Sequence, residues 1–221
     1  MKKLLSVGLI AAMAMGCSAN KTTKGAGIGT LAGAAAGAAW GAARGDWKKG
    51  AAIGAASGAV IGGVSGAVMD KQDNDLRKAG IRTERDENGN LVVQMTGESL
   101  KFDTGKATLK PDGEALLDKL AGVISKYPEN RIAIQGHTDN TGSNSVNTVL
   151  SQNRADRVKA YLISKGLPSR CVIASTGFGP DMPVANNNTA DGRAMNRRVE
   201  LKISVDKDEA EKNEAARERA K

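Results

Sequence analysis

The sequence is poor in the residues that carry most enzyme chemistry and covalent cross-linking. Its 221 residues include one His and two Cys. A hydrolase needs a pair of carboxylates, a set of zinc ligands or a nucleophile with its base. No such group of residues stands out, and His137 has no His or Cys close by that would complete a zinc site. We therefore expect no enzyme, no metal site and no cofactor.

The first of the two cysteines follows a targeting signal. A basic start precedes an apolar stretch at residues 4–15, which is too short to span a membrane and has the form of a secretory signal. The Gly16-Cys17 pair after it resembles a bacterial lipobox, in which cleavage leaves Cys17 as the diacylated N-terminus. We thus predict a signal peptide at 1–16 and a lipidated tether at 17–24. By the same resemblance, Ser18 after the cysteine favours the outer membrane.

Loss of the signal peptide leaves no pair of cysteines for an intramolecular disulfide. Cys171 remains, and it opens an apolar run in which a buried, unreactive thiol is expected. Basic residues exceed acidic ones by 32 to 24, a formal net charge of +8 that becomes +6 (8 minus 2) without Lys2 and Lys3. This surplus suits an anionic polymer or lipid surface. Outside the cytoplasm, nucleic acid is not an expected partner.

Glycine is abundant, and many of the 27 glycines fall into two runs with a strict four-residue spacing. The runs are Gly25, Gly29, Gly33, Gly37, Gly41 and Gly45, then Gly50, Gly54, Gly58, Gly62 and Gly66. This spacing places each run on one face of a helix. In water each helical glycine costs ~1 kcal/mol relative to Ala, whereas in lipid small residues let helix backbones touch.

Each glycine run lies in an arm of about 20 residues, or roughly 30 Å of helix, which is enough to cross a hydrocarbon core. We predict a glycine-zipper helical membrane hairpin at 25–69 that packs on itself or forms a homo-oligomer. A flexible Gly/Ala linker is the alternative interpretation. Neither arm contains Asp or Glu, which argues against the coupling of ion passage to function.

The composition changes at residue 70. We expect a charged linker at 70–90, a globular domain at 91–205 and a charged, solvated tail at 206–221. Within the domain the pattern predicts strands at 91–96, 100–102, 131–135, 171–176 and 199–205. It also predicts two helices, one that begins at Pro111 and one at 146–165. Strands that alternate with two helices favour an α/β fold, a two-layer α+β sandwich.

Four motifs in this domain resemble the OmpA C-terminal-like domain, which has a βαβαββ order. They are residues 135–142 (QGHTDNTG), 150–158 (LSQNRADRV), 177–183 (GFGPDMP) and 196–200 (NRRVE). The likeness covers nearly all of residues 91–205. With the lipobox and the glycine hairpin in front, the whole chain resembles YiaD-type lipoproteins of Gram-negative envelopes.

The resemblance implies non-covalent binding of peptidoglycan through the diaminopimelate of its stem peptide. Diaminopimelate ends in an ammonium and a carboxylate on one carbon. Asp139 would accept from the ammonium, and Arg154 would donate two hydrogen bonds to the carboxylate. The remaining site residues implied are Asn147 and Ser151 on the helix face of Arg154, Thr138 and Asn140 as donors, and Arg197 and Arg198.

The simpler alternative is that Asp139 only caps a turn and Arg154 is a surface cation. The functional interpretation places a lipid-anchored protein in the outer membrane with its domain in the periplasm. A second hypothesis is an oligomeric or pore-forming membrane protein, or an envelope assembly factor, that uses the domain only as a wall anchor.

Overall fold

The computed structural model describes residues 64–100, 102 and 105–219. The predicted signal peptide, Cys17, the tether and all but the last residues of the predicted hairpin lie outside this part. Within the described residues, no helix is both long enough and apolar enough to cross a membrane.

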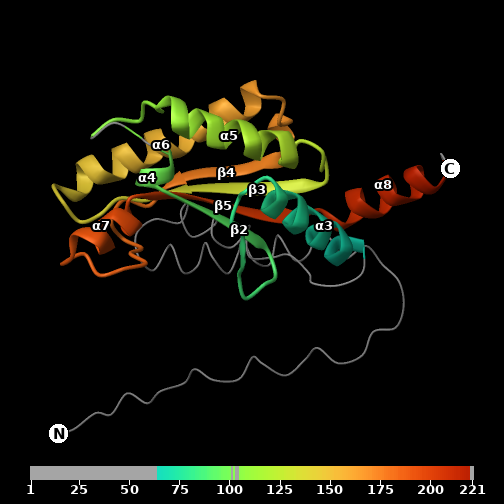
Figure 1. Cartoon of the computed structure of the whole chain (residues 1–221), viewed down its shortest axis with the longest axis horizontal. Coiled ribbons are helices and arrows are strands. Elements are labelled where there is room, and N and C mark those ends of the chain that lie inside the picture. Colours follow the sequence, from blue (N-terminus) through green and yellow to red (C-terminus); the bar gives the residue numbers. More distant parts are fainter. Residues whose placement is uncertain (1–63, 101, 103–104, 220–221) are drawn as a thin grey trace, which may run out of the picture.

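A five-stranded sheet forms the centre of the domain (Figure 1). The strands are β1 Glu84–Arg85, β2 Leu91–Thr96, β3 Asn130–Gly136, β4 Val172–Gly177 and β5 Arg198–Val205. Their order in space is β1-β2-β5-β3-β4. Only the β3–β4 pair of this sheet is parallel, since the other neighbours run antiparallel.

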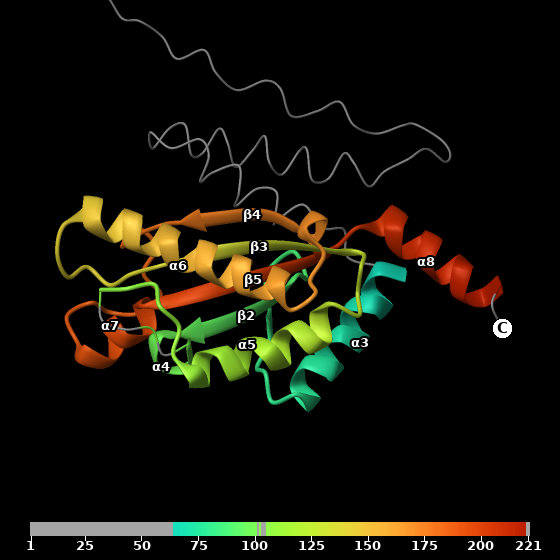
Figure 2. The same cartoon turned by 90° about the horizontal axis from the view of Figure 1, so that it is seen from above.

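Two helices, α5 Pro111–Ile124 and α6 Asn144–Ser164, cover one face of the sheet (Figure 2). The shorter elements are α4 Gly97–Leu100, a 3-10 turn at Ser169–Cys171 and α7 Ala190–Asn196. This arrangement confirms the predicted α/β fold class. Cys171 is fully buried, as expected. The short strand expected at 100–102 is absent from the described residues there, because α4 occupies the segment up to Leu100.

Local sequence explains how α5 and α6 begin and where α6 lies. Pro111 opens α5, where its fixed φ angle suits the first turn. Ser143 caps α6 by accepting a hydrogen bond from the backbone N–H of Val146. Gly136 and Gly177, at the ends of β3 and β4, then let α6 approach closely. A Cβ at these glycines would lie 2.1 Å from the Ser151 carbonyl oxygen and 2.2 Å from the Gln152 nitrogen.

The prediction of a linker at 70–90 is wrong. Helix α3 Val64–Lys78 runs without a break past the expected end of the hairpin at Met69 and packs on the domain. Met69, Leu76 and Ile81 are buried in the main hydrophobic core. The Tyr127 hydroxyl also donates to Asp75 over 2.8 Å. The segment is therefore an integral part of the fold rather than a spacer.

The expected tail also forms a helix, α8 Lys207–Arg219, which lies beside α3 (Figure 1). Asp206 caps it by accepting from the Glu209 backbone N–H, and the same carboxylate pairs with Arg131 over 2.8 Å. Ala210 is buried and Asn213 donates to Glu129. The first turns of the tail are thus docked on the domain.

Candidate functional site

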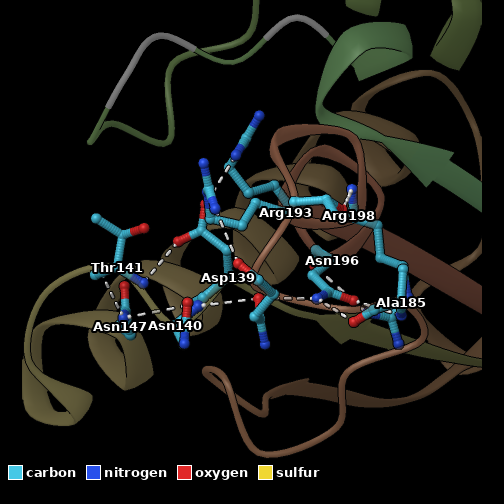
Figure 3. A network of polar contacts seen from close by, with 12 residues as sticks. Asp139, Asn140, Thr141, Asn147, Ala185, Arg193, Asn196 and Arg198 are labelled. Carbon is cyan, nitrogen blue, oxygen red and sulfur yellow. Dashed lines mark hydrogen bonds and ion pairs between the residues drawn. The ribbon is translucent and has the colours of Figure 1, made fainter.

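Asp139 lies in the loop that follows β3, at one end of the sheet. Its Oδ1 accepts from the Thr141 backbone N–H over 2.9 Å, which closes an Asx turn. Asn147 on α6 holds the same loop, because its side-chain amide donates to the Thr141 carbonyl over 2.9 Å and to the Asp139 carbonyl over 3.4 Å (Figure 3). The capping role considered for Asp139 is therefore real, but it uses only one of the two carboxylate oxygens.

The second oxygen of Asp139 binds a guanidinium. Arg197 Nη1 donates to Asp139 Oδ2 over 2.7 Å. The side chain of Arg197 is 41% exposed and that of Asp139 only 11%. Burial raises the pKa of Asp139, but the hydrogen bonds from Arg197 and Thr141 outweigh burial, so the pKa lies below its ordinary value. Asp139 is thus an anion at neutral pH.

Arg154 is the second cation of the site. It is 7% exposed, its Nε donates to the Lys106 carbonyl over 3.1 Å, and its guanidinium lies 5.0 Å from the centre of the Phe102 ring. Burial lowers the pKa of Arg154, the positive charge of Arg197 lowers it further, and Asp139 opposes both. Asp139, Arg154 and Arg197 therefore interact electrostatically, and we call them the charged triad.

Three other predicted site residues surround the triad. Ser151 is fully buried, where it donates to the Thr148 carbonyl and accepts from the Gly179 N–H, so it joins α6 to the loop after β4. The Thr138 hydroxyl is buried and lacks a hydrogen-bond partner within the described part of the chain. Asn140 is exposed, and its backbone N–H donates to the side chain of Asn187 over 3.4 Å.

Arg198 belongs to the interior, and its expected role as a ligand contact needs correction. Its Nε donates to Glu200 Oε1 over 2.6 Å, with the two side chains only 3% and 8% exposed. The other guanidinium nitrogens donate to the Asn196 and Met182 carbonyls. A side chain buried and bonded in this way supports the loop after β4 and presents nothing to a ligand.

Sequence reasoning assigned no role to Asn196, which organises that loop. Its Oδ1 accepts from the backbone N–H groups of Val184 and Ala185, and its Nδ2 donates to the Ala185 carbonyl and to Asn187 (Figure 3). Asn196 opens the NRRVE motif, so a signal was present. Phe102, beneath Arg154, was likewise given no role in the site.

His137 is fully enclosed next to the site. It stacks on Phe178 with ring centroids 5.3 Å apart, and burial, then Arg198 and Lys202, lower its pKa to about 2. Its imidazole is thus neutral across the physiological range. The described residues contain no cluster of potential metal ligands.

Two protein families match parts of the chain. Residues 101–197 match the OmpA family and residues 1–70 match the YMGG-like Gly-zipper family. The chain is 39% identical over 129 residues to Probable lipoprotein YiaD of Escherichia coli, which covers 58% of each protein. It is 39% identical over 113 residues to Peptidoglycan-binding protein ArfA of Mycobacterium tuberculosis, which covers 51% of this chain and 34% of that protein.

The fold is also similar to a solved structure, the cell wall anchor of the T6SS from Pseudomonas aeruginosa. The TM-score is 0.52 at 29% identity, over 62% of this chain and 96% of that one. The chain spans about a third of the length of ArfA and 58% of the length of YiaD. The similarity to the OmpA family thus covers residues 101–197, and the similarity to the YMGG-like Gly-zipper family covers residues 1–70.

Proposed function

We propose that this protein is an envelope lipoprotein that binds peptidoglycan non-covalently through the free end of diaminopimelate. The relative ArfA is named for peptidoglycan binding, and the T6SS structure is that of a cell wall anchor. The observation that carries the proposal is the charged triad, which sets one carboxylate and two guanidiniums at the end of the sheet. Such a group suits a zwitterion and supports a binding protein rather than an enzyme.

Arg154 is the receptor for the ligand carboxylate. The Phe102 ring and the Lys106 carbonyl fix its guanidinium, and the two Nη atoms, which have no hydrogen bond to another described residue, suit a forked pair of hydrogen bonds. Among the described residues, the ion pairs of this end of the domain join Arg197 to Asp139 and Arg198 to Glu200, and Arg154 takes part in neither. Asp139 accepts from the ligand ammonium.

The membrane attachment lies at the other end of the sheet. Strand β3 starts at Asn130, close to the Tyr127–Asp75 contact with α3, and ends at Gly136, just before Asp139. Its seven residues span roughly 20 Å at ~3.3 Å per residue. We place the acylated Cys17 and the hairpin at the α3 end, in the outer membrane, with the charged triad turned toward the wall in the periplasm.

Sedimentation of the full chain in detergent with purified sacculi tests the binding function. Asp139→Ala and Arg154→Ala each leave an opposite charge of the ligand without its partner, which typically costs ~2–5 kcal/mol. The affinity should decrease by a factor between about 30 and several thousand. In this assay, such a decrease reduces sedimentation to background. Arg157→Ala, an exposed arginine on α6, is the matched control and should bind like the wild type.

A soluble stem peptide with diaminopimelate should compete with sacculi, and the same peptide with lysine should compete poorly because its side chain lacks the carboxylate. If both triad variants still sediment and high salt strips the wild type equally, retention comes from net charge alone and the proposal fails.

The membrane part of the proposal needs separate tests. Cys17→Ala should abolish acyl labelling and leave a larger, uncleaved precursor, and unchanged labelling would exclude the lipid anchor.

The match of residues 1–70 to a Gly-zipper family also favours the second candidate, a self-associating membrane segment. Ile at Gly33 and Gly58 should reduce crosslinked oligomers because bulky side chains keep helices apart. Unchanged crosslinking would favour a linker.

A further inference from the structure

The ligand-free site already contains a cation on the acceptor that a ligand ammonium would use. Arg197 donates to Asp139 Oδ2 and the Thr141 backbone to Oδ1. With 11% of the Asp139 side chain exposed, an incoming ammonium meets a carboxylate whose two oxygens are engaged from within the protein. Arg197 therefore stands where the ligand cation has to go.

The charge balance of the triad makes this competition selective. Among the described residues of the triad, two guanidiniums lie near one carboxylate. The two cations repel each other, and this repulsion lowers the pKa of Arg154, although burial lowers it more. A ligand carboxylate relieves this excess of positive charge. A ligand that brings only an ammonium adds to it and must still displace Arg197 from Asp139.

Arg197 is built to move, in contrast to its neighbour. Its backbone is fixed, since its N–H donates to the Arg193 carbonyl and its own carbonyl accepts from the Gly97 N–H. Its side chain is 41% exposed and pairs with Asp139, whereas the Arg198 side chain is 3% exposed and bonded to Glu200. The Arg197 guanidinium can thus turn into solvent while the loop stays in place.

We propose that Arg197 is an internal counter-ion that the ligand ammonium displaces from Asp139, so that only a ligand whose carboxylate binds Arg154 offsets the loss. This inference rests on the proposed function and extends it to selectivity. Arg197 then discriminates between a zwitterionic side-chain end and a bare amine. If Arg197 were instead a ligand contact, its removal would weaken binding, which is the opposite effect.

The test uses the full chain in detergent and two stem peptides that differ only in diaminopimelate or lysine. Arg197→Ala should bind the lysine peptide about fivefold more tightly, the size of an exposed ion pair, and the diaminopimelate peptide no less tightly than the wild type. Arg157→Ala should leave both affinities unchanged. Weaker binding of the diaminopimelate peptide by Arg197→Ala overturns the inference.

Side-chain NMR of Arg197 gives a second readout that does not depend on measurable lysine binding. Saturation with the diaminopimelate peptide should move the guanidinium resonances of Arg197 to their positions in Asp139→Asn, which lacks the ion pair. Resonances that stay in place at saturation overturn the inference but leave the binding function intact. If the wild type binds neither sacculi nor the diaminopimelate peptide, the proposed function itself fails.

Discussion

The two ends of the sheet use similar residues in different ways. At the end where α3 and α8 pack, polar side chains form matched pairs that include Tyr127 with Asp75 and Arg131 with Asp206. At the other end the charged triad sets two guanidiniums against one carboxylate, with Arg154 almost fully buried. Matched pairs hold the fold together, whereas the triad has, among the described residues, an excess of positive charge that the proposed ligand carboxylate would offset.

Arg198 is an exception to this difference between the two ends of the sheet. It lies at the end that holds the charged triad, but it forms a matched pair with Glu200. Arg198→Ala leaves the buried Glu200 carboxylate without its partner, and loss of one half of a buried pair costs ~3–5 kcal/mol. Urea unfolding should show this loss, while Arg197→Ala should cost less, because the Arg197 side chain is 41% exposed and its pair is only partly buried. Equal losses in the two variants would remove the distinction between the neighbouring arginines.

Leu76 tests whether α3 belongs to the fold. It is fully buried in the core, so Leu76→Ala should lower the free energy of unfolding by ~2–5 kcal/mol. Peptide affinity of the protein that remains folded should not change. Lys71→Ala, on the exposed side of the same helix, should stay within ~0.5 kcal/mol. A negligible effect of Leu76→Ala would return residues 70–90 to the status of a linker.

Substitution of Tyr127 tests the contribution of a single hydrogen bond, the one to Asp75 at the end of the sheet where α3 packs. Burial first, and then the hydrogen bond to Asp75, raise the pKa of its phenol, so the hydroxyl remains a donor at all relevant pH values. Tyr127→Phe should cost ~0.5–1.5 kcal/mol in urea unfolding. Tyr161→Phe removes a more exposed bond to Asp118 and should cost less. The reverse order would mean that the α3 contact contributes little.

The smallest expected effect is that of pH on peptide binding. The pKa of Asp139 in the folded protein is lowered, so the carboxylate that accepts from the ligand keeps its charge until the pH falls below the ordinary carboxyl range. Binding should therefore be flat from pH 7 down to about 4, the ordinary carboxyl range. His137, with a pKa of about 2, should add no inflection near pH 6.5.

In Arg197→Ala the acid limb should move to higher pH, because Asp139 has lost the hydrogen bond that lowers its pKa. Carboxyl titration by NMR checks both proteins. An Asp139 titration at the same pH in the two would show that the ion pair does not hold in solution.

The sequence predicted the features that depend on local pattern and on motifs. Strands β2 to β5, the two covering helices and the choice of Asp139 and Arg154 came from periodicity and from the OmpA-like motifs, whereas β1 was not predicted and the strand expected at 100–102 is absent from the described residues. Helix α3 was missed because mostly charged and polar residues separate its buried apolar residues Met69 and Leu76. Its stability comes from tertiary packing, which no local pattern records.

The roles of the site residues depended on contacts between distant segments. Ser151 lies on the expected helix face, but that face packs against the loop after β4 through Gly179. One feature of the sequence could have predicted that Arg198, and not Arg197, is the buried arginine. Arg198 and Glu200 are two residues apart on β5 and so share a face of the strand.

Amide hydrogen exchange of the full chain, with and without the diaminopimelate stem peptide, tests the division between the two ends most directly. The account predicts slower exchange on binding in residues 138–154 and 196–198, and no change in α3 or α8. Protection in α3 and α8 with none around Asp139 and Arg154 would contradict it, because the ligand would then bind at the attachment end.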